Sequence, residues 1–319
     1  MSMQQPPTDK ENFSDLTNQE QPESRQAKLL AVLFRFELER TFRSKSLIIF
    51  LAIYFTLALL VAILLGSSYD TFLEQLAENP FPSDFPLFKE IEINSKTWAN
   101  FFSVNMSINS FVTQLGLIVT AFYGAQIVTR DLKNESILLV TGTRVERWTI
   151  LLTKYFTACI TSLTIVLSST FFSIICMDIV PLITEKEVVF KEVVGYSMIY
   201  FLRAILPIIL YVVTITAVSM LVGVFVKTPT FAIIGSIVVL LFYDSIFSTA
   251  YMFAPSNWHL EYFSPSANLL EIIFWAVGIV SGGEVIFQPA PWGSLVIFPL
   301  LLLGALCGAF FRFQKMDFK

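Results

Sequence analysis

Long apolar runs recur along the chain and determine its predicted architecture. The clearest covers residues 47–66 and contains no charged residue. A helix needs about 20 mostly apolar residues to cross the ~30 Å hydrocarbon core of a bilayer, at ~1.5 Å per residue. Five further runs meet this requirement: 109–128, 155–176, 197–226, 231–253 and 292–311. The pattern therefore predicts an all-α polytopic membrane protein with six transmembrane helices.

Two of these regions depart from a plain apolar run. The second span carries Thr113, Gln114 and Gln126, which we expect to face protein or water, because unsatisfied polar groups are costly in hydrocarbon. Between the fifth and sixth spans lies a shorter run, 269–280, which contains Glu271. It is short for a spanning helix, so we interpret it as an outer re-entrant or interfacial half-helix that packs against the bundle.

The N-terminal region divides into two parts. Residues 1–25 are polar and are predicted to form a disordered cytoplasmic tail. Residues 26–45 show helical spacing and predict an amphipathic helix at the membrane surface, while a plain helical extension of the first span is the alternative. Residues 46–319 form the six-span domain. The two stripes of the surface helix are Ala31, Phe34, Leu38 and Phe42 on one side and Lys28, Arg35, Glu39 and Arg43 on the other.

Composition and charge agree with a membrane location and give an orientation. Only 14% of residues are charged and 55% are hydrophobic, whereas globular proteins average roughly 25% charged. With the N-terminus inside, most of the 21 Lys and Arg residues fall on the cytoplasmic side. A seventh span at 269–280 would place Arg312, Lys315 and Lys319 outside, against this bias. We therefore predict a multi-pass protein of the cell membrane with both termini cytoplasmic.

The cytoplasmic loop between the second and third spans is the main candidate site. Residues 129–148 surround an apolar segment, 137–140, with charges. An exposed apolar segment of this kind favours a short helix covered by a cytosolic partner. The alternative is that 137–140 dips into the membrane interface. The candidate residues are Arg130, Asp131, Glu135, Ile137, Leu138, Leu139, Arg144 and Arg147.

Two charges lie within the fourth and fifth spans. At ~1.5 Å per residue, Arg203 lies roughly 9 Å and Asp244 roughly 14 Å below the outer surface. Because isolated charges at membrane depth cost free energy, we predict an intramembrane ion pair between them. The alternative is that Arg203 reaches the outer headgroups while Asp244 faces an aqueous cavity or stays protonated.

Several catalytic motifs are absent from the sequence. There is no Gly-x-x-x-x-Gly-Lys-Ser/Thr phosphate loop and no His-Glu-x-x-His pair, and His259 is the single histidine. Cys159, Cys176 and Cys307 all lie in apolar runs. The chain is therefore predicted to be no enzyme itself, to hold no cofactor or metal, and to bind membrane lipid but no nucleic acid.

The order of elements resembles the permease subunits of ABC transporters, in particular the type-2 exporter class. The residues that carry the resemblance are Gly124-Ala125, Arg130-Asp131, Glu135, Leu138-Leu139, Arg147 and Lys154. Two positions depart from the family pattern. Arg144 stands where the family usually has Pro, and Glu135-Ser136 replaces a usual Gly-Thr pair.

The resemblance implies a function and partners. In that family, the loop after the second span carries a cytoplasmic coupling helix that docks into a separate ATPase subunit, which binds ATP and magnesium. It also implies a second permease copy, in a homo- or heterodimer, and an exported substrate whose identity the sequence does not give. A different class of function also fits, namely a non-transporting membrane scaffold or regulator whose loop recruits a cytosolic partner.

Overall fold

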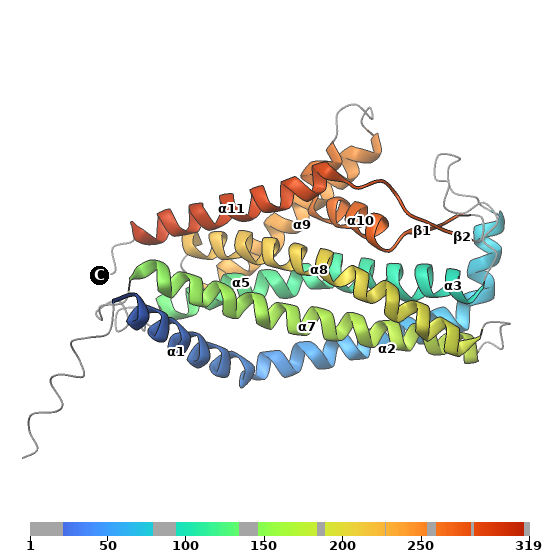
Figure 1. The fold of residues 1–319 in the computed structure, drawn as a ribbon, viewed down its shortest axis with the longest axis horizontal. Coiled ribbons are helices and arrows are strands. Elements are labelled where there is room, and N and C mark those ends of the chain that lie inside the picture. The colour runs from blue at the N-terminus through green and yellow to red at the C-terminus, as the bar shows by residue number, and fades with distance from the viewer. Residues whose placement is uncertain are drawn as a thin grey trace, which may run out of the picture.

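The computed structural model describes residues 22–78, 94–133, 146–183, 189–226, 228–253, 260–281 and 284–315. Six helical stretches in these ranges are long and apolar enough to cross a membrane. They run side by side along the long axis of the molecule (Figure 1). The helices are α2 (Lys45–Glu78), α5 (Leu115–Lys133), α7 (Arg147–Ile183), α8 (Phe190–Val226), α9 (Pro229–Phe253) and α11 (Trp292–Gln314). The predicted helical membrane protein with six spans is thereby confirmed at this level.

The second span is longer than the sequence predicted. It extends over Ser95–Leu132 rather than 109–128. The added portion contains buried polar side chains, including Asn100 and Ser103, which lowered its hydropathy and hid it from the sequence pattern. Its parts before α5 are α3 (Ser95–Trp98), η2 (Ala99–Asn105), α4 (Met106–Ile108) and η3 (Asn109–Gln114), of which η2 and η3 are π-helical.

The second span and α8 form the centre of the bundle, where they pack closely. A Cβ atom on Gly124 of α5 would lie 2.8 Å from the carbonyl oxygen of Thr216 on α8. One on Gly223 of α8 would lie 2.9 Å from the carbonyl oxygen of Ala125. Glycine at both positions therefore lets the two backbones approach each other. α8 also packs against α7, α9 and α11.

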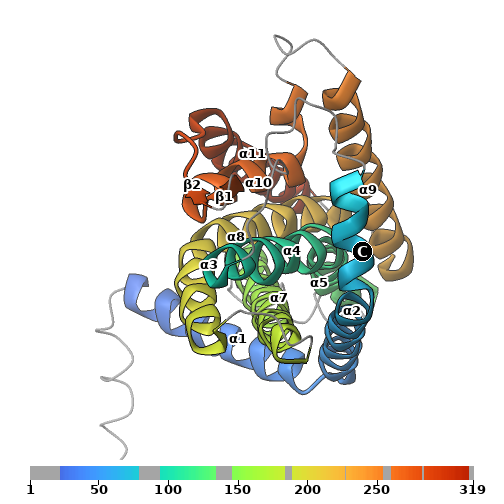
Figure 2. The ribbon, with the colours of Figure 1, turned by 90° about the vertical axis from the view of Figure 1, so that its right-hand side faces the viewer.

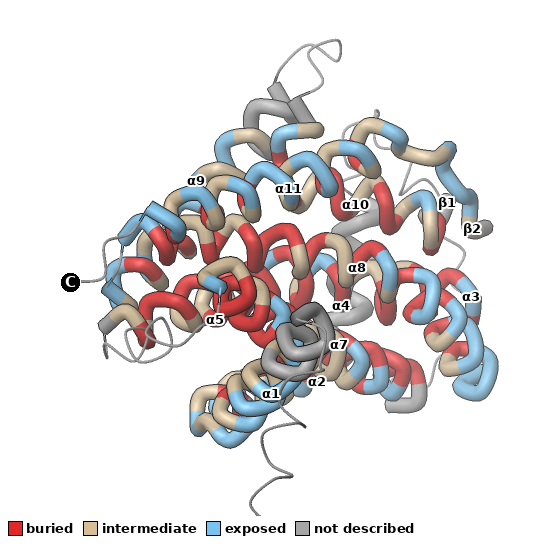
Figure 3. Tube along the Cα trace, turned by 60° about the vertical axis from the view of Figure 1, so that its left-hand side comes forward, coloured by how far each residue is buried: buried red, intermediate tan, exposed pale blue. Residues whose placement is uncertain are grey.

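The outer helices expose large apolar side chains. In the most apolar 18-residue stretch of each helix, 22% of α2 and 17% of α9 is buried, against 67% of the second span. Figure 3 shows the same contrast, with exposed positions along α9 and α11 and buried ones along α5 and α8. An exterior of this kind is stable in contact with lipid tails rather than water.

The N-terminal helix α1 (Pro22–Phe42) is separate from the first span. Arg43 and Ser44 break the helix before α2 begins at Lys45, and α1 then crosses α7 obliquely (Figures 1 and 2). The alternative of a plain helical extension is therefore wrong. The helix begins at Pro22, inside the stretch predicted to be a tail, and residues 1–21 lie outside the described residues.

The two predicted stripes of α1 are only partly separated. Phe34 and Leu38 are half-buried, while Ala31 and Phe42 of the same apolar stripe are exposed. On the charged stripe, Arg35 and Glu39 form an exposed ion pair, whereas the burial of Lys28 lies outside the described part. Contact with α7, rather than hydrophobicity alone, determines which side of α1 is covered.

The short apolar run before the last span forms a helix and part of a hairpin. Following the one-turn η5 (Leu260–Phe263), α10 (Pro265–Ala276) ends before β1 (Ile279–Ser281), which pairs antiparallel with β2 (Glu284–Ile286). The predicted half-helix at 269–280 thus begins earlier and ends earlier than expected. The Asn100 side-chain amide donates to the carbonyl oxygens of Val277 and Gly278, which fixes the non-helical turn after α10.

Candidate functional site

Four charged side chains from three helices meet near one end of the bundle. Glu37 and Arg40 come from α1, Asp131 from the last turn of α5, and Lys154 from the second turn of α7. We call these four residues the ion cluster. α5 and α7 are the helices that flank residues 134–145, so the ion cluster lies at the base of the predicted docking loop.

The ion cluster is connected by short contacts. Lys154 Nζ lies 2.9 Å from Glu37 Oε1 and also donates to Asp131 Oδ2. Arg40 Nη1 donates to Asp131 Oδ1 at 3.1 Å and lies 3.9 Å from Glu37 Oε2. Each cation therefore contacts both carboxylates, and the Arg40–Asp131 bond links α1 to α5.

Burial makes these contacts energetically important. The Lys154 side chain is 3% exposed and that of Asp131 is 7% exposed. Removing one partner of a buried ion pair leaves an uncompensated charge and typically costs about 3–5 kcal/mol. Two carboxylates and two cations leave the ion cluster formally neutral. The four charges hold α1, α5 and α7 together, because removing any one of them leaves an opposite charge in the ion cluster without one of its partners.

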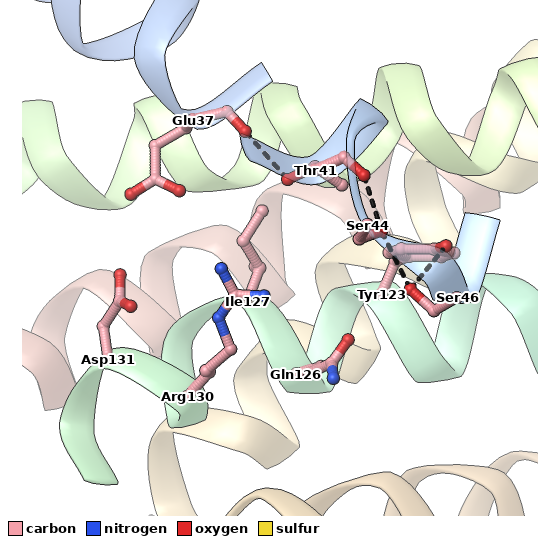
Figure 4. Close-up of a pocket in the computed structure, with 9 residues that line it drawn as sticks. All are labelled: Glu37, Thr41, Ser44, Ser46, Tyr123, Gln126, Ile127, Arg130 and Asp131. Carbon is pink, nitrogen blue, oxygen red and sulfur yellow. Dashed lines mark hydrogen bonds between the residues drawn. The ribbon is translucent and has the colours of Figure 1, made fainter. Parts of the chain in front are cut away.

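A small polar pocket adjoins the ion cluster at the break between α1 and α2 (Figure 4). Its volume of ≈ 20 Å³ is room for about one water molecule. The Ser44 hydroxyl donates to the Thr41 carbonyl oxygen and contacts Ser46 Oγ, which in turn contacts the Tyr123 hydroxyl. The pocket is too small for a substrate. Its lining residues are Glu37, Thr41, Ser44, Ser46, Tyr123, Gln126, Ile127, Arg130 and Asp131.

The structure describes three of the eight loop residues named from the sequence. Asp131 belongs to the ion cluster, and Arg130 lines the adjoining pocket. Arg147, at the start of α7, donates from Nη1 to the Gln314 carbonyl oxygen at 2.7 Å and so ties α7 to the end of α11. Docking through the loop stays a prediction, since its other members lie outside the described residues: Glu135, Ile137, Leu138, Leu139 and Arg144.

Sequence reasoning did not bring Glu37 and Arg40 into the site, and it named Lys154 only among the residues that carry the family resemblance. A usable signal was present for Lys154, because it begins a long apolar run and a lysine there needs an acidic partner. Glu37 and Arg40 are three residues apart and therefore share one face of α1. That spacing identifies a pair on one helix, but it does not say which other helix the pair contacts.

The predicted ion pair between Arg203 and Asp244 is wrong. Asp244 of α9 accepts hydrogen bonds at the start of α10, from Ser264 Oγ at 2.7 Å and from Ser266 N and Oγ at 3.0 and 2.6 Å. The guanidinium carbon of Arg203 lies 5.3 Å from the centre of the Phe287 ring, on the exposed side of α8. Matching the two depths ignored the direction in which each helix presents its side chain.

The three polar residues noted in the second span have different surroundings. Thr113 is buried and Gln126 is half-buried beside the pocket, as expected, whereas Gln114 is exposed.

Comparison with known proteins adds no assignment: no protein-family model matches this chain, and no curated protein matches it. The case for a function therefore rests on the residues and their geometry.

Proposed function

We propose that this chain is the transmembrane permease subunit of an ATP-driven exporter of the ABC class. In this proposal, a separate cytosolic ATPase subunit binds ATP and magnesium, and a second permease copy completes the pathway. Both termini lie on the cytoplasmic side, α1 lies at that membrane surface, and α10 enters from the outer side without crossing. The chain contributes no catalytic residue of its own.

The ion cluster is the observation that supports this proposal best. An ATPase that docks on residues 134–145 pushes on the end of α5 and the start of α7, which flank that segment. Asp131 and Lys154 lie on those two ends and bind each other as well as α1. A displacement of the loop is therefore carried into three helices at once, which is what coupling to a transport cycle requires.

Docking also needs an apolar contact, which Leu138 and Leu139 would supply. We expect the chain purified in mild detergent from its native membrane to carry a polypeptide with a phosphate loop and to hydrolyse ATP. Changing both leucines to Asp should remove that polypeptide and the ATP hydrolysis, because buried carboxylates oppose docking. Mass spectrometry and phosphate release measure the two outcomes.

A matched control separates docking from folding. The double change Leu138→Met with Leu139→Met keeps the apolar surface and should keep the ATPase bound. All variants are compared at equal membrane insertion. Retention of the ATPase by the double Asp variant would contradict docking at this segment. A native preparation with no ATPase would favour the alternative, a scaffold that recruits another cytosolic protein.

A further inference from the structure

A cavity of ≈ 520 Å³ lies between α8, α9 and α11, beneath η5 and the start of α10. Figure 2 shows α9 and α11 standing apart over α8, with α10 at the same side of the bundle. The floor is formed by α8, including Ile215, and the walls by α9 and α11. We call this space the lateral pocket. It shares no lining residue with the small polar pocket beside the ion cluster, and none of the four residues of the ion cluster lines it.

The lining of the lateral pocket favours an apolar occupant. Thr214, Tyr243 and Tyr262 are the polar residues among the side chains that line it, and none of the lining residues is charged. The Thr214 hydroxyl already donates to the Leu210 carbonyl oxygen at 2.8 Å. Pockets of about 300–1,000 Å³ with mostly apolar walls are typical of small-molecule sites. A charged or strongly polar ligand would lose its hydration here without gaining partners.

The mouth of the lateral pocket lies at the depth of lipid tails. Val239 of α9 and Leu300 of α11 line the pocket and are 51% and 61% exposed. At ~1.5 Å per residue, both lie roughly 12–15 Å from the start of their helices, near the middle of a ~30 Å hydrocarbon core. The molecules available to enter at that depth are lipid chains or another apolar helix.

Volume decides between these two occupants. A helix is about 10 Å across and rises ~1.5 Å per residue, so a space of this size holds only about four residues of one. It is large enough for one flexible hydrocarbon chain. We propose that the lateral pocket binds an acyl chain of a membrane lipid, which enters between α9 and α11 and lies against α8.

Gly304 provides a way to fill the lateral pocket without disturbing the packing. A Cβ atom on Gly304 would meet no atom within 4 Å, whereas one on Gly308 would lie 3.2 Å from Leu221 Cδ1. Gly304→Leu therefore places a side chain into the pocket, and Gly304→Ala occupies much less of it. Gly195 offers a matched control, since a Cβ atom there also meets nothing within 4 Å and the residue lies elsewhere on α8.

The experiment uses phosphatidylcholine with a photoreactive diazirine in the middle of one acyl chain, mixed into phosphatidylcholine vesicles that hold the full-length protein. After illumination, mass spectrometry locates the labelled residues. Lipid that contacts the outside of the helix bundle labels the exposed Leu300 whether or not the pocket is occupied. Labelling of Ile215, which is 1% exposed, requires a chain inside the lateral pocket, so we expect it in the wild-type protein and in Gly195→Leu.

Filling the pocket should remove the internal label alone. We expect Gly304→Leu to lower labelling of Ile215 about tenfold, Gly304→Ala to lower it little, and neither to change labelling of Leu300. Absence of Ile215 labelling in the wild-type protein would overturn the proposal, whether or not Gly304→Leu folds. Unchanged labelling of Ile215 in a folded Gly304→Leu variant would also overturn it. A second copy of the chain as the occupant is tested with Leu300→Cys: a disulfide between two copies, together with no labelling of Ile215, would contradict a lipid chain in the pocket.

Discussion

Asp131 and Asp244 both lie within long apolar helices, yet their carboxylates are stabilised in different ways. Asp131 contacts two cations, Arg40 and Lys154, which come from other helices. Asp244 contacts no cation among the described residues, and instead accepts three hydrogen bonds from Ser264 and Ser266 at the start of α10. One acid is held by opposite charges, and the other by hydroxyl groups and a helix N-terminus.

The N-terminus of α10 explains how Asp244 is satisfied without a cation. The first backbone N–H groups of a helix have no partner within the helix, and the helix dipole places positive charge there. Ser264 caps α10 by accepting from Ala267 N while its own hydroxyl donates to Asp244. Asp244 thereby fixes α10 to α9. A carboxylate at membrane depth is therefore not evidence for a nearby Arg or Lys.

Asp178 near the end of α7 follows the second arrangement. It is buried and accepts a hydrogen bond at 2.7 Å from the Ser197 hydroxyl on α8. The ion cluster is thus the place where two acids and two bases of this bundle are in direct contact, with Lys154 and Asp131 buried, as far as the described residues show. Its position beside residues 134–145 distinguishes it from the acids that only join neighbouring helices.

The largest effect in this comparison should come from Lys154→Met. The change leaves Glu37 and Asp131 close together, with Arg40 in contact with them and Arg130 nearby to balance their charge. We expect a loss of about 3–5 kcal/mol of stability, the usual cost of breaking a buried ion pair from one side. Thermal unfolding in detergent, followed by intrinsic fluorescence, measures it. Lys191→Met, at an exposed position on α8, is the matched control and should change little.

A second substitution tests whether charge balance is the cause. Adding Asp131→Leu to Lys154→Met leaves Glu37 and Arg40 as a neutral pair, and replacing both partners of a buried pair by apolar residues is often close to neutral. We expect the double variant to be more stable than Lys154→Met alone. A double variant that loses the sum of the two single effects would show that Asp131 and Lys154 act independently.

The apolar pattern was sufficient to predict the number of spans and most of their positions. Hydropathy is a local property, so residues 47–66 or 292–311 identify a span without knowledge of their neighbours. It failed at the start of the second span, where Asn100 and Ser103 are buried against protein rather than exposed in a loop. A polar residue inside a bundle and one in water are identical in the sequence.

The candidate site was only partly predictable for a related reason. Asp131 was identified because it lies in a charged segment, but its partners Lys154 and Arg40 are far from it along the chain. Which side chains meet depends on the rotation of each helix about its axis, and that is determined by packing such as the close approach at Gly124. The same missing information led to the incorrect pairing of Arg203 with Asp244.

A smaller effect is expected when Asp244 is removed. Asp244→Ala leaves Ser266 N and two hydroxyls without their acceptor, and we expect it to cost about 1–2 kcal/mol, as for the loss of a helix cap. Asp244→Asn keeps an oxygen acceptor and should cost less. Hydrogen exchange of the amides of α10, followed by mass spectrometry, should accelerate in the order wild type, Asn, Ala. Equal exchange in all three would show that Asp244 does not hold α10.

The smallest effect should be the coupling between Arg203 and Asp244. Because the two side chains have different partners, the stability losses of Arg203→Ala and Asp244→Ala should add to within about 0.3–0.5 kcal/mol. The charge swap, Arg203→Asp with Asp244→Arg, provides the stricter test. It places a cation at the N-terminus of α10, where the helix dipole opposes it, so we expect the swap to be less stable than either alanine variant. Recovery of stability by the swap would contradict this assignment, since only a direct ion pair predicts it. Thermal unfolding of the wild-type protein, the two alanine variants, their double variant and the charge swap under one set of conditions decides between these outcomes.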